Sequence, residues 1–96
     1  MENNENSELK VYVLYPNIQK EELNNIKIIR IKDKKYNFYV MKDYWPIIGE
    51  INGSIYFEGE TTKSFENINA FYSLSHNEFN LIIRKMEQWY SQILKV

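Results

Sequence analysis

Short apolar runs separated by polar residues recur over the first two-thirds of the chain, and the first of them alternates with a period of two. In residues 9–15 the side chains of Leu9, Val11 and Val13 fall on one side of an extended backbone. Runs rich in β-branched and aromatic residues follow at 26–31, 36–41, 47–51 and 54–58. The pattern predicts a mostly antiparallel sheet built from these segments.

Polar residues between the predicted strands indicate two hairpins and one loop. The run from Lys32 to Lys35 predicts a turn between the second and third strands. Asn52 and Gly53 separate the fourth and fifth strands, and both residues accept the positive φ of a type I′ turn. Pro46 predicts a loop or bulge over residues 44–46, because proline cannot donate a ladder hydrogen bond.

Two segments are ambiguous. Residues 18–25 contain good helix formers but are too short for more than one or two helical turns, so they predict either a short helix or a polar crossover loop. Residues 65–74 fit helical spacing as well as a strand. The alternation of Ala70, Tyr72 and Leu74 favours the strand.

The C-terminal segment predicts a long helix. Ser75 and Glu78 have the spacing of a capping box at its start. Apolar residues then recur at spacings of three and four, with Leu81 on the opposite side. The apolar stripe consists of Phe79, Ile82, Ile83, Met86, Tyr90, Ile93 and Leu94. We therefore expect a disordered tail over residues 1–8 and a single α+β domain over 9–96, in which the helix packs on one face of a five- or six-stranded sheet.

Apolar side chains on both faces of the predicted strands exceed what one helix can cover. An antiparallel sheet normally exposes one polar face, and large exposed apolar patches mark interaction sites. The candidate partner-binding residues are Tyr12, Leu14, Tyr39, Met41, Tyr44 and Trp45. We expect the first four to form one contiguous patch. The alternative is a strongly twisted sheet that wraps around the helix like a barrel and buries both of its sides.

Charge is unevenly distributed along the chain. Residues 27–43 contain six Lys or Arg and two Asp, a net charge of +4 in a chain whose net charge is −1. Aromatic residues are interleaved with these cations, an arrangement that can stack a base while holding its phosphate. Nucleotide or oligonucleotide binding is therefore the alternative function, with Arg30, Lys42, Tyr39 and Trp45 as its candidate ligand-binding residues. The competing interpretation is that the lysines protect a sheet edge and the aromatic rings pack in the core.

Catalytic groups are few. The chain has no cysteine, which excludes thiol nucleophiles, thiolate metal sites and disulfides. His76, the one histidine, is expected to be a solvated first-turn residue whose ring points about 100° away from Ser75 on the helix, too far for a hydrogen bond. Glu50, Glu58 and Glu60 are expected to be solvated carboxylates at strand ends. No catalytic residue, metal or cofactor is predicted.

These observations favour a small, non-catalytic protein-binding module. We expect a bacterial or phage inhibitor or immunity-type protein that docks on a partner protein, and a homodimer is compatible with this function. The acidic, polar N-terminus differs from a signal peptide, and no apolar run approaches the ~18 residues of a membrane span, so a cytoplasmic location is expected.

Overall fold

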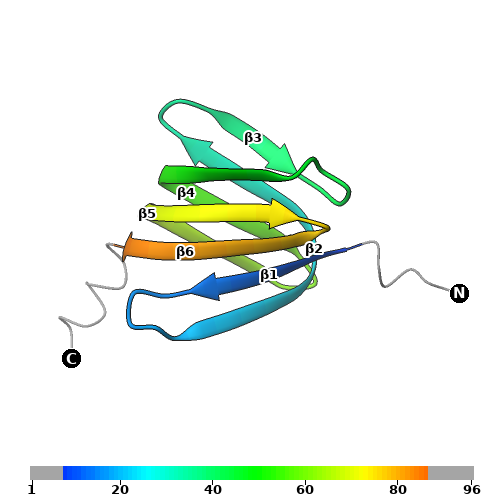
Figure 1. Cartoon of the computed structure of the whole chain (residues 1–96), viewed down its shortest axis with the longest axis horizontal. Coiled ribbons are helices and arrows are strands. Elements are labelled where there is room, and N and C mark those ends of the chain that lie inside the picture. Colours follow the sequence, from blue (N-terminus) through cyan, green and yellow to red (C-terminus); the bar gives the residue numbers. More distant parts are fainter. Residues whose placement is uncertain (1–7, 87–96) are drawn as a thin grey trace, which may run out of the picture.

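The protein folds into strands throughout the part that the computed structural model describes, residues 8–86. The strands are β1 (Leu9–Leu14), β2 (Lys20–Asp33), β3 (Asn37–Val40), β4 (Ile47–Gly59), β5 (Thr62–Ser75) and β6 (Glu78–Met86) (Figure 1). Residues 8–86 contain no helix, so the predicted α+β fold with a long C-terminal helix is wrong. Residues 1–7 of the tail predicted over 1–8, and the part of the predicted helix from residue 87 onward, lie outside the described residues.

The sheet closes on itself. Its strand order is β1-β6-β5-β4-β2-β3, and β1 also pairs with β2, so five strands form a closed barrel with β3 beside β2. An up-and-down barrel with an odd number of strands must join its first and last strands in parallel, and β1 and β6 do pair in parallel. Closure buries the inner face of the sheet without a helix. The barrel-like alternative considered from the sequence had the sheet wrap around the C-terminal helix, and that part of it is wrong.

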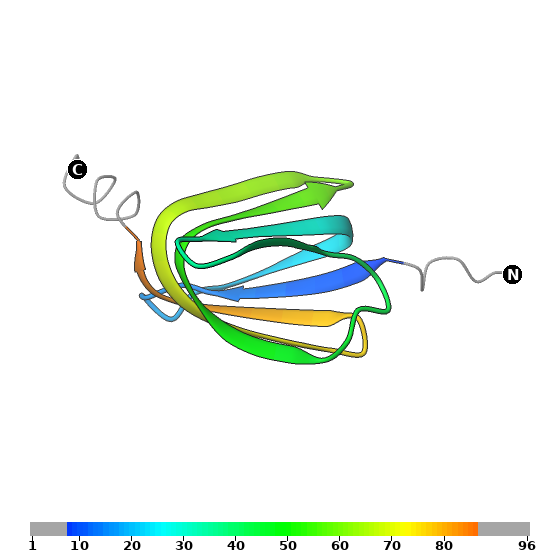
Figure 2. The same cartoon turned by 90° about the horizontal axis from the view of Figure 1, so that it is seen from above.

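The barrel is flattened because its long strands bend. Gly53 of β4 pairs with Ile68 of β5, but Ile55 pairs with Phe65, so β5 carries one extra residue at this point. Asn67 lies in this bulge with a φ of 57°, and such bulges bend and twist a strand pair. Figure 2 shows β4 and β5 curving from one layer of the molecule to the other.

Aromatic rings connect the two layers of the core. The ring of Phe57 on β4 lies 6.0 Å from that of Phe79 on β6 and 6.4 Å from that of Phe65 on β5, both in edge-on geometry. The residues of β1 alternate as predicted, with Leu9, Val11 and Val13 buried. None of the described polar or charged residues is buried.

The predicted hairpin between the second and third strands is confirmed, because Ile31 of β2 pairs with Phe38 of β3. The predicted Asn52-Gly53 turn is wrong: both residues lie inside β4, and Gly53 has no positive φ. A Cβ atom at Gly53 would lie 2.3 Å from the Lys32 carbonyl oxygen, so glycine is needed for the close approach of β2. The short helix or loop expected over 18–25 is also wrong, since β2 begins at Lys20, whereas β5 confirms the strand expected over 65–74.

The predicted helix cap is a hairpin turn. Ser75 and Glu78 face each other as the last residue of β5 and the first of β6. His76 and Asn77 between them have φ values of 52° and 62°, the conformation of a type I′ turn. Leu81, which the helical prediction placed opposite the core, is fully buried.

Candidate interaction site

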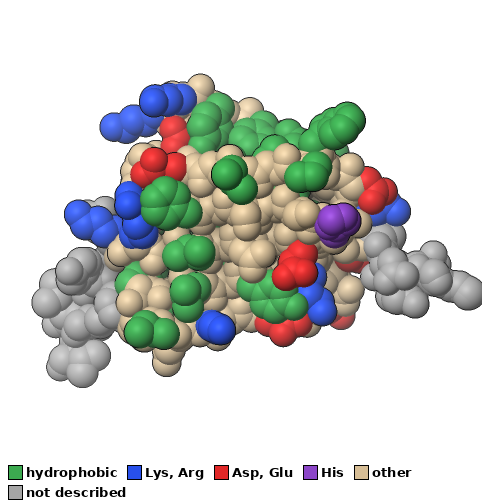
Figure 3. All heavy atoms as spheres, in the orientation of Figure 1, with side chains coloured by type: hydrophobic (Ala, Val, Ile, Leu, Met, Phe, Trp, Pro, Cys, Tyr) green, Lys and Arg blue, Asp and Glu red, His purple; other side chains and the backbone are tan. Residues whose placement is uncertain are grey.

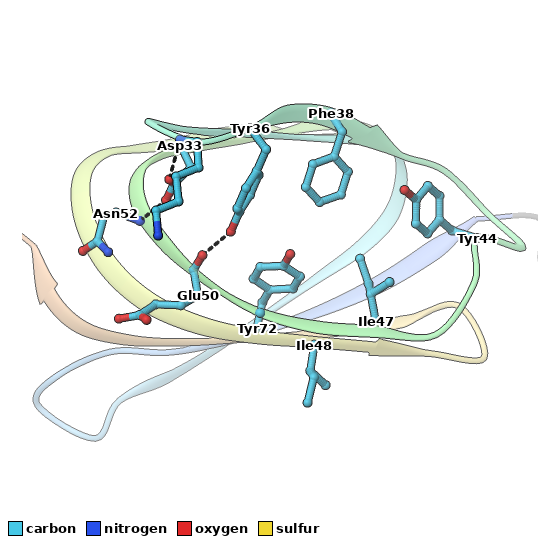
Figure 4. Close-up of a pocket in the computed structure, with 11 residues that line it drawn as sticks. Asp33, Tyr36, Phe38, Tyr44, Ile47, Ile48, Glu50, Asn52 and Tyr72 are labelled. Atoms are coloured by element: carbon cyan, nitrogen blue, oxygen red, sulfur yellow. Dashed lines mark hydrogen bonds between the residues drawn. The ribbon is translucent and has the colours of Figure 1, made fainter.

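A cleft of about 510 Å³ lies between β3, the β3–β4 loop and the first half of β4 (Figure 4). Its volume falls in the range of ligand and side-chain binding sites. The lining residues are Asp33, Lys35, Tyr36, Phe38, Tyr44, Ile47, Ile48, Gly49, Glu50, Asn52 and Tyr72. The cleft is therefore mostly aromatic and apolar, with polar groups at one end.

Aromatic rings form two sides of the cleft. On one side, the Phe38 ring lies 5.5 Å from that of Tyr36 and is stacked 6.2 Å from that of Tyr44. Tyr72 of β5 lies on the opposite side (Figure 4). A Cβ atom at residue 49 would lie 2.5 Å from the Tyr72 hydroxyl oxygen, so Gly49 leaves the space that this ring occupies.

Tyrosine hydroxyls supply the polar groups inside the cleft. Tyr36 donates a hydrogen bond to the carbonyl oxygen of Glu50, and its hydroxyl also interacts with that of Tyr72. Burial raises the pKa of Tyr72, and the neighbouring Tyr36 hydroxyl raises it further. Burial likewise raises the pKa of Tyr36. Both phenols therefore stay neutral at physiological pH.

Asp33 fastens the β2–β3 turn to β4. Its carboxylate accepts hydrogen bonds from the backbone nitrogens of Asn52, at 2.5 Å, and Lys35, at 3.0 Å. Partial burial alone would raise the pKa of Asp33, but these backbone hydrogen bonds outweigh it and the pKa is lowered. The carboxylate is ionised and already engaged, and it holds this end of the cleft in place.

The first half of β4 has a free edge beside the cleft. The Asn52 nitrogen bonds to Asp33 and the Glu50 oxygen to Tyr36, so these residues direct their backbone groups away from β5. In an antiparallel ladder the backbone N–H and C=O of one residue point to the same side of the strand, and every second residue points to that side. Ile48 therefore also directs its backbone groups away from β5. On this side no strand of residues 8–86 pairs with Ile48 or Glu50, and no turn or loop hydrogen bond engages the nitrogen and oxygen of Ile48 or the nitrogen of Glu50.

The loop next to this edge exposes large apolar side chains. Met41 is 51% exposed and Trp45 81%, and Ile48, at the start of β4, is 83% exposed. Tyr44 turns inward to the cleft, in a turn where its backbone nitrogen donates to the Met41 oxygen at 3.2 Å. We call residues 41–48 the docking segment.

The structure divides the predicted partner-binding residues into two groups. Tyr39, Met41, Tyr44 and Trp45 lie on β3 and the β3–β4 loop, whereas Tyr12 and Leu14 lie on β1. Tyr12 pairs with Glu22 and Tyr39 with Arg30, and these two partners are eight positions apart on β2, roughly 26 Å of strand. They do not form the contiguous patch that we expected, because β1 and β3 pair with different halves of β2.

Leu14 instead belongs to an apolar row on the outer face of the barrel. It pairs with Ile82, which pairs with Phe71 of β5. Figure 3 shows hydrophobic side chains gathered on this face, across β5, β6 and β1. The sequence analysis missed Ile82 and Phe71 as surface residues, because the helical interpretation placed Ile82 in the core. Phe79, Leu81 and Ile83 are buried and alternate with less buried residues, and this alternation was the signal for a strand.

The predicted nucleotide-binding residues do not line one hollow. Arg30 lies between two rings, its guanidinium carbon 5.8 Å from the centroid of Tyr39 and 5.8 Å from that of Tyr56. The adjacent hollow contains Arg30 and Tyr39 but neither Lys42 nor Trp45. The structure therefore brings together only two of the four candidate residues.

Ser75 and His76 are closer than the sequence analysis expected. The Ser75 Oγ atom lies 3.0 Å from the His76 Nδ1 atom, because the two residues occupy a tight turn and not a helix. Both side chains are exposed. Glu50 forms a 3.1 Å ion pair with Arg84, and Glu60 accepts a hydrogen bond from Asn25. Over residues 8–86, no cluster of three or more His, Asp or Glu side chains could hold a metal ion.

The described residues include no helix with the length and apolar character needed to cross a membrane.

Comparison with known proteins finds similarity of fold only. No family model matches the chain, and no curated protein matches it significantly. One similar solved chain belongs to the cryo-EM structure of the Tetrahymena thermophila mitochondrial ATP synthase (central stalk and c-ring), with a TM-score of 0.67, 8% identity, and coverage of 81% of this chain and 64% of that chain. Another belongs to the Euglena gracilis mitochondrial ATP synthase (OSCP, F1 and c-ring), with a TM-score of 0.63, 12% identity, and coverage of 99% and 66%. This chain thus spans slightly less than two thirds of either, and identities this low establish the shared fold without a shared function.

Proposed function

We propose that the protein is a non-catalytic binding module that docks on a partner protein through the docking segment and the adjacent cleft. One observation carries the proposal. Of the seven large apolar side chains exposed among the described residues, four lie within residues 39–48: Tyr39, Met41, Trp45 and Ile48. Tryptophan, tyrosine and methionine are enriched in the cores of protein interfaces, and a partner that covers them gains free energy from their burial.

The segment is held in place before any partner binds. Asn77 in the β5–β6 turn bonds to Asp43 in the loop, and Asp33 ties the β2–β3 turn to Asn52. A surface that is already ordered loses less conformational entropy on binding. Such a module acts as an inhibitor or immunity-type protein when the surface that it covers is one its partner needs, which is the role expected from the sequence.

The proposal is tested by comparing two matched substitutions. The wild-type protein is used to capture its partner from cells of the organism that encodes it, and the partner is then purified and titrated by calorimetry. We expect Trp45→Ala combined with Ile48→Thr to weaken binding at least about tenfold, as for a truncated interface anchor. Ile18→Thr changes a side chain that is 78% exposed on the β1–β2 turn, and should leave the affinity unchanged.

Thermal unfolding of each variant shows whether it remains folded. A double variant that is folded and binds as tightly as wild type would contradict the proposal. So would an equal loss of affinity in the Ile18→Thr control.

A further inference from the structure

We propose, building on the proposed function, that the cleft receives an extended acidic segment of the partner, which adds as a strand to the free edge of β4 at Ile48 and Glu50. The backbone, the cleft walls and the charge of the hairpin each contribute to this inference.

The free edge begins where β2 ends. β2 pairs with β4 only from Gly53 to Gly59, which leaves residues 47–52 without a neighbour on that side. Two backbone groups there are already satisfied, the Glu50 oxygen by Tyr36 and the Asn52 nitrogen by Asp33. The remaining groups, on Ile48 and Glu50, are two residues apart, which is the repeat with which an added strand forms its hydrogen bonds.

The cleft gives an added strand a place for alternate side chains. Successive side chains of a strand point to opposite faces. Those on the inner face would enter between Phe38 and Tyr44 on one side and Tyr72 on the other (Figure 4). Those on the outer face would lie beside the exposed side chain of Ile48. The inner positions therefore favour apolar or aromatic residues.

The charge of the neighbouring hairpin favours an acidic occupant. Residues 27–43 carry a net charge of +4, and of their charged residues Asp33 and Lys35 line the cleft. The two carboxylates in the lining are engaged, Asp33 by backbone hydrogen bonds and Glu50 by its ion pair with Arg84. Lys35 has no ion-pair partner within residues 8–86, so it is the lining charge left to meet an occupant. A second copy of this chain would bring two such basic hairpins together, and like charges disfavour that pairing.

The test measures amide hydrogen exchange of the full-length protein by NMR. The probe is a blocked peptide that alternates Glu with Val and has one central Phe, and its control replaces every Glu with Lys. We expect the acidic peptide at millimolar concentration to slow exchange at the Ile48 and Glu50 amides at least about fivefold. The effect should weaken as salt is added, and the Lys peptide should give none.

Unchanged exchange at both amides with the acidic peptide would overturn the inference, and equal protection by the Lys peptide would overturn its acidic character. Protection without any peptide, together with a dimeric mass by light scattering, would show that a second copy occupies the edge. Because the probe is not the partner, these results are independent of the capture experiment. A partner that binds through Trp45 without protecting Ile48 and Glu50 would refute this inference and leave the proposed function standing.

A matched pair of variants isolates the backbone contribution. Glu50→Pro removes the free N–H on the cleft side and leaves the hydrogen bonds to β5, since proline is tolerated at a strand edge. Glu50→Ala loses the same carboxylate and its contact with Arg84 but keeps the N–H. We expect the proline variant alone to lose peptide binding, and retained binding by a folded Glu50→Pro protein would contradict strand addition.

Discussion

Asn77 and Asp43 hold each other through two reciprocal hydrogen bonds. The Asp43 backbone nitrogen donates to Asn77 Oδ1 at 2.6 Å, and Asn77 Nδ2 donates to Asp43 Oδ1 at 3.2 Å. Both residues have a left-handed backbone, with φ values of 62° and 64° respectively. The pair links the β3–β4 loop to the β5–β6 turn, although the two residues are 34 positions apart in sequence.

Loss of this link should loosen the docking segment. Asn77→Gly keeps the left-handed turn but removes both side-chain hydrogen bonds, so we expect the free energy of unfolding to fall by about 1 kcal/mol. Amide exchange over residues 41–46 should become faster. His76→Gly alters the same turn without touching Asp43, and it should leave exchange in the loop unchanged. Equal exchange rates in the two variants would show that the link does not order the loop.

Gly53 should not tolerate a methyl group. Its substitution by alanine places a Cβ atom 2.3 Å from the Lys32 oxygen, so we expect a loss of about 1–3 kcal/mol in denaturant unfolding. In an ordinary strand, replacing glycine by alanine raises the free energy of unfolding by roughly 0.5–1 kcal/mol. A decrease for Gly53→Ala would therefore point to the close contact with β2. Ser54→Ala, at the next position, should have little effect. A Gly53→Ala protein as stable as wild type would contradict the close approach of β2.

Substitution of Ile18 should stabilise the protein. It has a φ of 72°, a conformation that costs a β-branched residue roughly 1–2 kcal/mol. Asparagine adopts this conformation more readily, so Ile18→Asn should raise the free energy of unfolding by about 1 kcal/mol with an unchanged denaturant slope. Ile48→Asn makes the same change at a similarly exposed but extended position and should not stabilise. Stabilisation by both variants would point to lost apolar exposure and not to backbone strain.

Tyrosine ionisation should be coupled to unfolding at high pH. Burial raises the pKa of Tyr72 and of Tyr15, and the Glu21 carboxylate raises that of Tyr15 further. Because their folded pKa values lie above the unfolded value of about 10, these phenols contribute stability below pH ~10 that is lost as the pH rises beyond it. We expect tyrosinate absorbance to rise in two steps, the second of them together with loss of the circular dichroism of the fold. A single step near pH 10 with an intact fold would contradict this, and Tyr72→Phe should reduce the second step.

Local patterns were enough to predict the strands that alternate strictly. Val11 and Val13 repeat with a period of two and are buried. The polar run after Ile31 forms the predicted turn, and Ile31 pairs with Phe38 across the hairpin. Each of these features depends on neighbouring residues alone. The hairpin of β2 and β3 therefore followed from the sequence.

The C-terminal strand has helical spacing in its second half, for a physical reason. Ala70 pairs with Ile83 but Asn69 pairs with Lys85, which leaves Arg84 as an extra residue in a bulge of β6. The next inward residue is consequently Met86, and the spacing from Ile83 to Met86 becomes three, as on a helix. Only the pairing with β5 shows the bulge.

The cleft depended on contacts between distant segments. The aromatic residues of the β2–β3 hairpin and Tyr44 were evident in the sequence, but Tyr72 joins the cleft only because β5 pairs with β4 and places it opposite Gly49. The free edge of β4 was hidden by the apparent turn at Asn52 and Gly53. A close approach of backbones and a turn both require glycine, and the sequence does not distinguish them.

The most direct test of the docking surface places a photo-crosslinking amino acid, benzoylphenylalanine, at position 45 or at position 18. Both positions are highly exposed, and they lie on different loops. We predict that the protein labelled at 45 forms a covalent adduct with its purified partner on irradiation, and that the protein labelled at 18 does not. Crosslinking from position 18 and none from position 45 would contradict the account.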